Sequence, residues 1–495
     1  MLDLHWAGDV RDRCFYPPPL FPLPWLAIRV EWRRPSSFFD PHNSSRPTLR
    51  GRIVAETALK TPEQMRKLFH PESVAVVGAS TDPSKLGHEI MKNIIDAGFA
   101  WPVYPVNPKA EEILGRPVSA SISALADPVD LAVVIVPARF VPGVISECGE
   151  RGVGAAIVIT GGFKESSPAG EALEAELVEA AQKAGVTVVG PNCQGINHPY
   201  HGLCASWPLL TNRGPIALVS QSGTVGAALM DWAQLEGLGV SCFVSMGNRC
   251  DVDESDLIAY FAQDEHTRAI AIYLEGVKDG RKFIAAVEAC EKPLIILKAG
   301  RTERGRVAAE SHTKSLAGRD EIYEAVFRQY GIYRAETLEE LYDYAKALAY
   351  MKAPKGRRIL FLTSSGGAAI IATDAAVECG LEVPHLPEEL YAGLRKELPE
   401  HFVVGNPFDL TGDATAKIYS EVAEKAAEHF DVLGLIFGDP IDDAHTAVDP
   451  ARGDLVIFLG GAEIERAERE KIHAMGVPVF PTPERGIKAL AQLYK

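Results

Sequence analysis

The residue whose surroundings point most directly to chemistry is His312, in the stretch GRTERGRVAAESHTKSLAG at 300–318. Small residues surround it in the sequence, and the preceding segment, GRTERGR, is basic and contains glycine. Because no bulky neighbour in sequence can pack against the imidazole, we expect an accessible side chain on a mobile loop. A neutral imidazole in that setting is suited to act as a nitrogen nucleophile.

A carboxylate that could assist His312 stands at the end of an earlier apolar strand. Glu275 closes AIAIYLEG (269–276), and the next predicted strand, 292–300, leads into the histidine segment. A carboxylate at this place can accept the imidazole N–H, fix the tautomer and leave the other nitrogen nucleophilic. The alternative is a solvated charge at a strand end.

A third feature is suited to binding anions. The stretch GPIALVSQSGTVGAALMDW predicts a strand at 215–219, a tight turn and a helix from about Thr224. Ser222, Gly223 and Thr224 therefore place hydroxyls and backbone N–H groups at a helix N-terminus, where phosphate binds well. An ordinary capping turn is the alternative. The same order of strand, Ser-rich turn and helix returns at 357–380, a weak internal repeat.

The elements that must position these residues alternate between short apolar strands and amphipathic helices from Leu68 onward. This alternation predicts α/β architecture with parallel sheets covered on both faces. Ligands in such folds bind beyond the carboxyl ends of the strands. Loop residues suited to a nucleotide-like ligand follow the first strands, in GASTDPSKLG, VNPK, VPARF, TGGFKE and GPNCQG.

Size, charge and cysteine usage exclude several classes of protein. A length of 495 residues predicts about three domains. A net charge of −16 argues against a nucleic-acid binder. The eight cysteines are scattered without zinc-ligand spacing, so we expect a reduced cytoplasmic protein with no metal site. No apolar run reaches the roughly 18 to 20 residues of a membrane span.

The N-terminal segment differs from the rest of the chain. Residues 1–64 combine a Pro-rich apolar stretch with a polar, basic one. We interpret them as disordered or as a misassigned start, and the alternative is an arm that binds a partner.

In their order, the motifs resemble the alpha subunit of the NDP-forming acyl-CoA synthetases, which include ADP-forming acetate–CoA ligase and relatives of succinyl-CoA synthetase. The matching pieces run from LFHPESVAVVGAS to PVFPTPERGIKAL and cover the chain from about Met65 to Lys495. The resemblance implies a CoA-binding Rossmann-like domain followed by two flavodoxin-like domains. We place these domains at 65–200, 201–352 and 353–495.

The resemblance also implies roles for individual residues. His312 matches the histidine that is phosphorylated, and Glu275 matches the carboxylate that orients it. Ser222, Gly223 and Thr224 match the helix start that holds phosphate. The family usually has glycine after SHT, where this chain has Lys314. The residues that match the CoA-binding region are Gly78, Ser80, Lys85, Asn107, Lys109, Val136, Pro137 and Asn192.

The implied reaction interconverts acyl-CoA, ADP and phosphate with a carboxylic acid, CoA and ATP, through an acyl phosphate and a phosphohistidine. The chain carries neither an ATP-grasp domain nor a GxxxxGK[ST] loop. We therefore expect ADP, ATP and Mg²⁺ to bind a separate ATP-grasp beta subunit, in a heterodimer or heterotetramer.

Two other functions remain open at this point. One is a catalytically impaired CoA- or acyl-CoA-binding regulatory protein, which Lys314 motivates. The other is a dinucleotide oxidoreductase, against which the poor match to GxGxxG argues.

Overall fold

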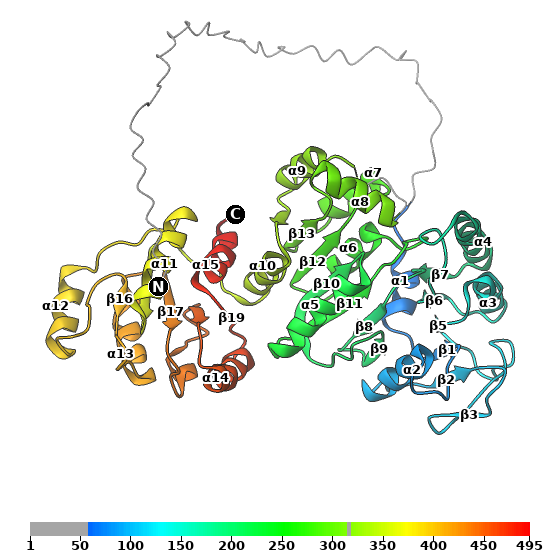
Figure 1. The fold of residues 1–495 in the computed structure, drawn as a ribbon, viewed down its shortest axis with the longest axis horizontal. Helices are drawn as coiled ribbons and strands as arrows, with labels where there is room; N and C mark the ends of the chain where they lie inside the picture. The colour runs from blue at the N-terminus through cyan, green and yellow to red at the C-terminus, as the bar shows by residue number, and fades with distance from the viewer. Residues whose placement is uncertain (1–57, 314–317) are drawn as a thin grey trace, which may run out of the picture. The chain divides into compact units, whose positions relative to one another are not determined.

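Three large sheets follow one another along the chain, each with helices on both faces (Figure 1). The computed structural model describes residues 58–313 and 318–495. Most strands are fully buried apolar runs, as a sheet covered on both faces requires, and the predicted α/β class is confirmed. Within the described residues, no helix has the length and apolar character needed to cross a membrane.

The first sheet is entirely parallel. Alternate strand residues enter two different cores, so α1 and α2 cover one face while α3 and α4 cover the other. In spatial order its strands are β2 (Val103–Val106), β1 (Val74–Val77), β5 (Leu131–Val134), β6 (Ala155–Val158) and β7 (Thr187–Val189). Its helices are α1 (Pro62–Phe69), α2 (Leu86–Asp96), α3 (Val141–Glu150) and α4 (Pro168–Ala184). A small ribbon of β3 (Glu112–Ile113) and β4 (Arg116–Pro117) follows β2.

The first described helix begins slightly before the domain start that the sequence indicated. Helix α1 starts at Pro62, because Thr61 and Gln64 form a reciprocal capping box at its N-terminus. The last residues of the expected extension at 1–64 therefore belong to the fold. Residues 1–57 lie outside the described part of the chain.

The second sheet is parallel apart from an antiparallel edge formed by β8 and β9. In spatial order its strands are β14 (Tyr333–Ala335), β13 (Leu294–Lys298), β12 (Ala269–Leu274), β10 (Arg213–Ser220), β11 (Val240–Ser245), β8 (Gly195–His198) and β9 (Leu203–Ala205). Its helices are α5 (Gly223–Leu235), α6 (Glu254–Gln263), α7 (Gly280–Glu288), α8 (Glu303–Thr313), α9 (Asp320–Gln329) and α10 (Leu338–Tyr350). The antiparallel pair means that 195–205 joins the second sheet.

The third sheet is again entirely parallel. Helices α11 and α15 share a core with α5 and α10, while α12, α13 and α14 pack on the other face. Its strands are β16 (Phe408–Asp409), β15 (Ile359–Thr363), β17 (Val432–Phe437), β18 (Leu455–Phe458) and β19 (Val479–Phe480). Its helices are α11 (Gly366–Glu378), α12 (Glu388–Glu397), α13 (Ala416–Ala426), α14 (Ala462–Ala474) and α15 (Pro483–Ala491).

Candidate active site

A cleft of about 810 Å³ opens where loops of the first sheet meet the β10–α5 turn of the second. The loops after β6 and β7 contribute one side of it, and the loop after β11 contributes another. All of these loops follow the carboxyl ends of strands, which is where α/β folds bind ligands. Its polar lining includes Asn192, Gln194, Ser222, Gly223, Thr224 and Asn248.

The N-terminus of α5 faces this cleft. Ser222 is the N-cap, and its Oγ accepts a hydrogen bond from the Val225 N–H at 3.4 Å. Behind it, Ser220 Oγ donates to the Ser222 carbonyl at 2.6 Å and thereby holds the turn. The first N–H groups of a helix have no partner inside the helix, and the helix dipole adds partial positive charge. The turn therefore offers an anion site on the cleft wall.

Glu275 stands one residue beyond β12, at the same edge of the sheet. Its backbone N–H donates to Gln221 Oε1 at 2.6 Å, so the residue is tied to the β10–α5 turn. The residue is only 6% exposed. Burial, together with the charge of Glu275, raises the pKa of Tyr273 to about 12.

A buried cation on the neighbouring strand accompanies this carboxylate. Lys298 ends β13, is 2% exposed, and its Nζ lies 4.7 Å from the centre of the Tyr323 ring. Burial lowers the pKa of the Lys298 ammonium, although the nearby carboxylates of Asp320 and Glu275 act against this effect. The sequence offered a signal that we did not use, since Lys298 ends the otherwise apolar run LIILK.

The expected CoA-binding residues divide into a cluster and a separate member. The turns after β1 and β2 are held together by Asn107, whose Nδ2 donates to the Ala79 carbonyl at 2.7 Å. Gly78 has φ +95°, and a Cβ there would lie 2.3 Å from the Ile135 carbonyl oxygen, so only glycine fits. Ser80 and Val136 belong to the same edge of the first sheet.

Asn192 stands apart from that cluster and lines the cleft beside α5. Its φ is +58°, and its Nδ2 lies 3.4 Å from Asn248 Oδ1. Lys85, Lys109 and Pro137 are exposed. Their side chains are therefore accessible to a ligand that crosses the edge of the first sheet.

Comparison with known proteins decides the family. Three family models match in succession: a CoA binding domain (72–199), a succinyl-CoA ligase like flavodoxin domain (213–348) and a ligase-CoA domain (359–476). The chain is 42% identical to the Pyrococcus furiosus acetate–CoA ligase [ADP-forming] I subunit alpha, over 87% of this chain and 97% of that protein. The chain belongs to the ADP-forming acetate–CoA ligase family.

Further relatives agree with this assignment to the ADP-forming acetate–CoA ligases. The Archaeoglobus fulgidus acetate–CoA ligase [ADP-forming] I is 40% identical over 87% of this chain, which spans 63% of that longer protein. A solved structure of Ca. Korarchaeum cryptofilum acetyl-coenzyme A synthetase 1, in complex with phosphate and ADP, is 39% identical. It matches 87% of this chain and 96% of its own, with a TM-score of 0.79. Relatives of similar length are named alpha subunits, which implies a second subunit.

The histidine segment of this ligase-family chain differs from the sequence-based expectation. Residues 303–313 form helix α8 rather than a loop, and the His312 backbone lies in the last turn of that helix. The reason is composition, because Glu, Arg and Ala favour helix and Arg306 Nη1 pairs with Glu310 Oε1 at 2.9 Å. The side chain of His312, and Lys314 with its neighbours, lie outside the described residues.

Several polar residues of the cleft were not predicted from the sequence. Asn248 Nδ2 donates to Glu165 Oε2 at 2.6 Å and to Glu174 Oε2 at 2.7 Å, which braces the cleft wall. Burial raises the pKa of Glu165, but hydrogen bonds, chiefly from Asn248, outweigh it and leave the pKa below its usual value. Gln194 is 2% exposed, and neither atom of its carboxamide has a hydrogen-bond partner among the described residues.

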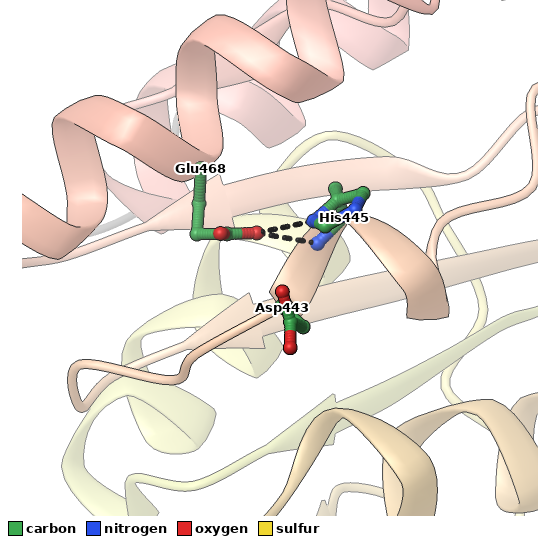
Figure 2. A group of neighbouring side chains, drawn as sticks. All are labelled: Asp443, His445 and Glu468. Atoms are coloured by element: carbon green, nitrogen blue, oxygen red, sulfur yellow. Dashed lines mark hydrogen bonds and ion pairs between the residues drawn. The ribbon is translucent and has the colours of Figure 1, made fainter.

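A second cluster of titratable groups lies on the third sheet. Figure 2 shows the Glu468 carboxylate directed at the Nδ1 and the backbone N–H of His445, with Asp443 nearby. Lys471 Nζ stands 2.7 Å from Glu468 Oε1 and 3.7 Å from Asp443 Oδ1. Burial raises the pKa of Glu468, but the hydrogen bonds from Lys471 and His445 outweigh burial and leave the pKa below its usual value. Lysine thus already supplies the positive charge that a metal ion would bring.

Proposed function

We propose that the chain is the alpha subunit of an ADP-forming acyl-CoA synthetase of the acetate–CoA ligase type. It interconverts acyl-CoA, ADP and phosphate with a carboxylic acid, CoA and ATP. The observation that carries this proposal is the cleft itself, where Asn192 from the CoA-binding side meets the N-terminus of α5. The same turn holds the peptide of Glu275.

The first step joins phosphate to the acyl group. Phosphate bound at the α5 N-terminus attacks the thioester carbonyl carbon, a C–O bond forms and the C–S bond breaks. Sulfur leaves as the CoA thiol with the proton that phosphate gives up. The N–H groups of the Ser222–Thr224 turn support this step, because they are oriented before the reaction and stabilise anionic charge.

The second step moves the phosphoryl group to the protein. The neutral imidazole of His312 attacks phosphorus, the bond to the acyl oxygen breaks and the carboxylate leaves. Glu275 accepts the N–H of the other imidazole nitrogen, which fixes the tautomer and stabilises the cationic phosphohistidine. Its burial supports this role, since a carboxylate acts more strongly on a neighbour where water is excluded. The phosphohistidine then transfers the group to ADP.

CoA lies along the edge of the first sheet in this proposal. Gly78 and Asn107 shape the turns after β1 and β2, and Ser80, Val136 and Pro137 contact the ligand. The exposed lysines, Lys85 and Lys109, balance its phosphates. The domain spans of 65–200, 201–352 and 353–495 belong to the same proposal.

A second subunit completes the enzyme. We propose an ATP-grasp beta subunit that binds ADP, ATP and Mg²⁺, in a cytoplasmic heterodimer or heterotetramer. The alpha-subunit names of relatives with similar length support a partner, and the longer relatives support fusion of the two parts in other organisms.

The decisive experiment is labelling of His312. The chain is incubated with the beta subunit and γ-labelled ATP, and separately with acetyl-CoA and labelled phosphate. We expect label that is labile to acid and stable to base from both sides, because phosphohistidine has this behaviour. The label should be absent from His312→Ala.

Two results would overturn the proposal. Label that persists in His312→Ala would place the phosphoryl carrier elsewhere. CoA binding without label from either side would favour the regulatory alternative. Glu303→Gln serves as a control in the same helix, because Glu303 is exposed in its first turn, and it should label like the wild type.

A further inference from the structure

One buried carboxamide connects two parts of the site that lie 54 residues apart in sequence. Gln221 Oε1 accepts from the backbone N–H groups of Glu275 at 2.6 Å and Gly276 at 3.2 Å. Its Nε2 donates to the Gly276 carbonyl at 2.9 Å. Gln221 is 7% exposed, so water does not compete for these bonds. A single side chain therefore holds both N–H groups and one carbonyl of the 275–276 segment.

An ion pair reinforces this clamp. Arg249 Nη1 donates to the Gly276 carbonyl at 2.7 Å and to Glu254 Oε2 at 2.9 Å. Gln221 Nε2 also lies 3.4 Å from Glu254 Oε2. Burial raises the pKa of Glu254, with the positive charge of Arg249 acting against it.

The ion pair points to positioning rather than to stability. Both partners are buried, and a buried ion pair typically adds little net stability because desolvation costs about as much as the attraction returns. Its clear structural consequence is geometric: it fixes Gly276, and with it the backbone from which the Glu275 side chain projects.

The position of Gln221 in the chain adds a second constraint. It immediately precedes Ser222, the N-cap of α5. Its own backbone N–H donates to the Tyr273 carbonyl at 3.2 Å, two residues before Glu275. The anion-binding turn and the carboxylate therefore share one rigid support.

We propose that Gln221 is a positioning residue that sets the Glu275 carboxylate relative to the N-terminus of α5. This inference rests on the proposed function, in which phosphate at α5 and the imidazole beside Glu275 must meet within bonding distance. Gln221 acts through Glu275 and the Ser222 turn. A displacement of about 1 Å in such a site costs about a hundredfold in rate.

The sharpest test is Gln221→Glu, because its pH dependence reports the hydrogen bond directly. The ionised carboxylate cannot donate to the Gly276 carbonyl, and it faces the Glu254 carboxylate. The protonated form restores one donor and one acceptor in nearly the same shape. Burial and the Glu254 carboxylate raise the pKa of the introduced carboxyl, whereas the Arg249 guanidinium and the N–H groups of 275–276 lower it. We expect burial and Glu254 to dominate, so the protonated form becomes populated on mild acidification.

We expect the rate of His312 labelling by Gln221→Glu to fall about a hundredfold at pH 8. The ratio of variant to wild-type rates should rise toward pH 6, and KM for acetyl-CoA should stay within about threefold because the CoA edge is untouched. Gln221→Ala should show a similar loss with a ratio that does not change with pH. Rapid-quench labelling of the chain with its beta subunit measures all of these quantities.

The control is the same substitution at another buried glutamine. Gln492 is 6% exposed, its Nε2 donates to the Lys488 carbonyl, and it does not line the cleft. Gln492→Glu should cost stability in chemical denaturation but leave the labelling rate per folded molecule within about twofold.

Two outcomes overturn the inference without touching the proposed function. One is a Gln221→Glu protein that labels at the wild-type rate. The other is a loss with the same pH-independent ratio as Gln221→Ala, since donation to Gly276 would then be irrelevant. If the wild type itself takes no label, the proposed function fails, and the inference fails with it.

Discussion

The second and third sheets carry the same turn at the same place but surround it with different chemistry. In the second, Ser220 bonds the backbone of Ser222, which caps α5. In the third, Thr363 bonds the backbone of Ser365 in the same way, and Ser365 caps α11. Both cap hydroxyls accept an N–H three residues on at 3.4 Å. The backbone frame of an anion site is therefore present twice.

The residue in the middle of each turn reaches the neighbouring strand. Gln221 binds the N–H groups of 275–276, and Ser364 binds those of 438–439 at 3.0 and 3.2 Å. By the registers of the β10–β12 and β15–β17 pairs, these N–H groups occupy equivalent positions. Gln221 also donates through Nε2 to the next carbonyl, that of Gly276, so its carboxamide holds this segment from both sides.

The charged residues around the two turns then differ. At the position of Glu275 the third sheet has Gly438, as the strand registers indicate. At the position of Ser245 it has Asp409. A methyl group on Gly366 at the start of α11 would stand 2.8 Å from the Asp409 Oδ2. The Asp409 carboxylate therefore already faces the start of α11, where it repels an anionic ligand. The Ser-capped turn and helix start are thus not sufficient to make an anion site.

The largest expected effect comes from removing the charge that distinguishes the second sheet. Glu275→Gln keeps the shape of the side chain but loses the negative charge that stabilises the imidazolium. We expect the rate of His312 labelling to fall about a thousandfold. Asp439→Asn, one residue past the equivalent place on the third sheet, should stay within about threefold. Equal losses in the two variants would break the comparison.

A smaller effect is expected from moving the third-sheet carboxylate into the second sheet. Ser245→Asp brings a negative charge near the N-terminus of α5, and we expect labelling from acetyl-CoA and phosphate to fall about a hundredfold. Ser245→Asn has nearly the same size without the charge, so it separates repulsion from crowding. The charge explanation is wrong if the two variants have the same rate, measured per folded molecule.

At Gln194 we expect a substitution to stabilise the fold. Its buried carboxamide has no hydrogen-bond partner among the described residues, and a buried polar group without hydrogen bonds lowers the stability of the fold. We expect Gln194→Leu to raise the free energy of unfolding by about 1 kcal/mol in urea titrations. A loss of stability would instead mean that the carboxamide makes a contact that holds the fold.

The smallest effect on stability at neutral pH is expected from replacing a buried histidine, either His198 in the second sheet or His473 beside the third. Burial, with nearby His70, lowers the pKa of His198 to about 3, and burial lowers that of His473 to about 4. A folded-state pKa below the usual value of 6.5 means that the unfolded chain binds more protons. The stabilising contribution is complete above pH 6.5 and is lost as the pH falls toward 3 or 4.

His198→Asn should therefore flatten the fall in the free energy of unfolding below pH 6.5, by up to about 1.4 kcal/mol per pH unit. Above pH 7.5 the variant should show no pH-dependent difference from the wild type. Denaturation curves between pH 4.5 and 8 measure this, and an unchanged slope would show that His198 is already protonated in the fold.

Features that depend on neighbouring residues were predictable. Apolar strand runs, Ser–Gly turns and helix starts are local patterns, so the α/β class, the Ser222 helix start and the strand end at Glu275 followed from the order of residues. The burial of Glu275 did not, because a solvated charge at the strand end fitted the same pattern. The segment around His312 was misjudged as a loop, because alanine, whose small size suggested exposure, also favours helix.

Features that depend on which strands become neighbours were not predictable. The sequence contains Gln221 and Glu275 but does not say that they meet, since they lie 54 residues apart. The antiparallel pairing of β8 with β11 was missed for the same reason. Strand order brings such residues together, and it is decided by packing of whole elements rather than by local propensity.

By itself, the amino-acid sequence determined the kind of chemistry available: an imidazole, a carboxylate and a helix start in a defined order along α/β repeats. Only the tertiary structure decided which of the two Ser–Gly turns stands beside that carboxylate. The physical reason is that a helix N-terminus attracts any anion, its own protein's carboxylates included. Register and side-chain reach, set when the sheets form, leave Asp409 facing α11 and Gln221 holding Glu275 beside α5.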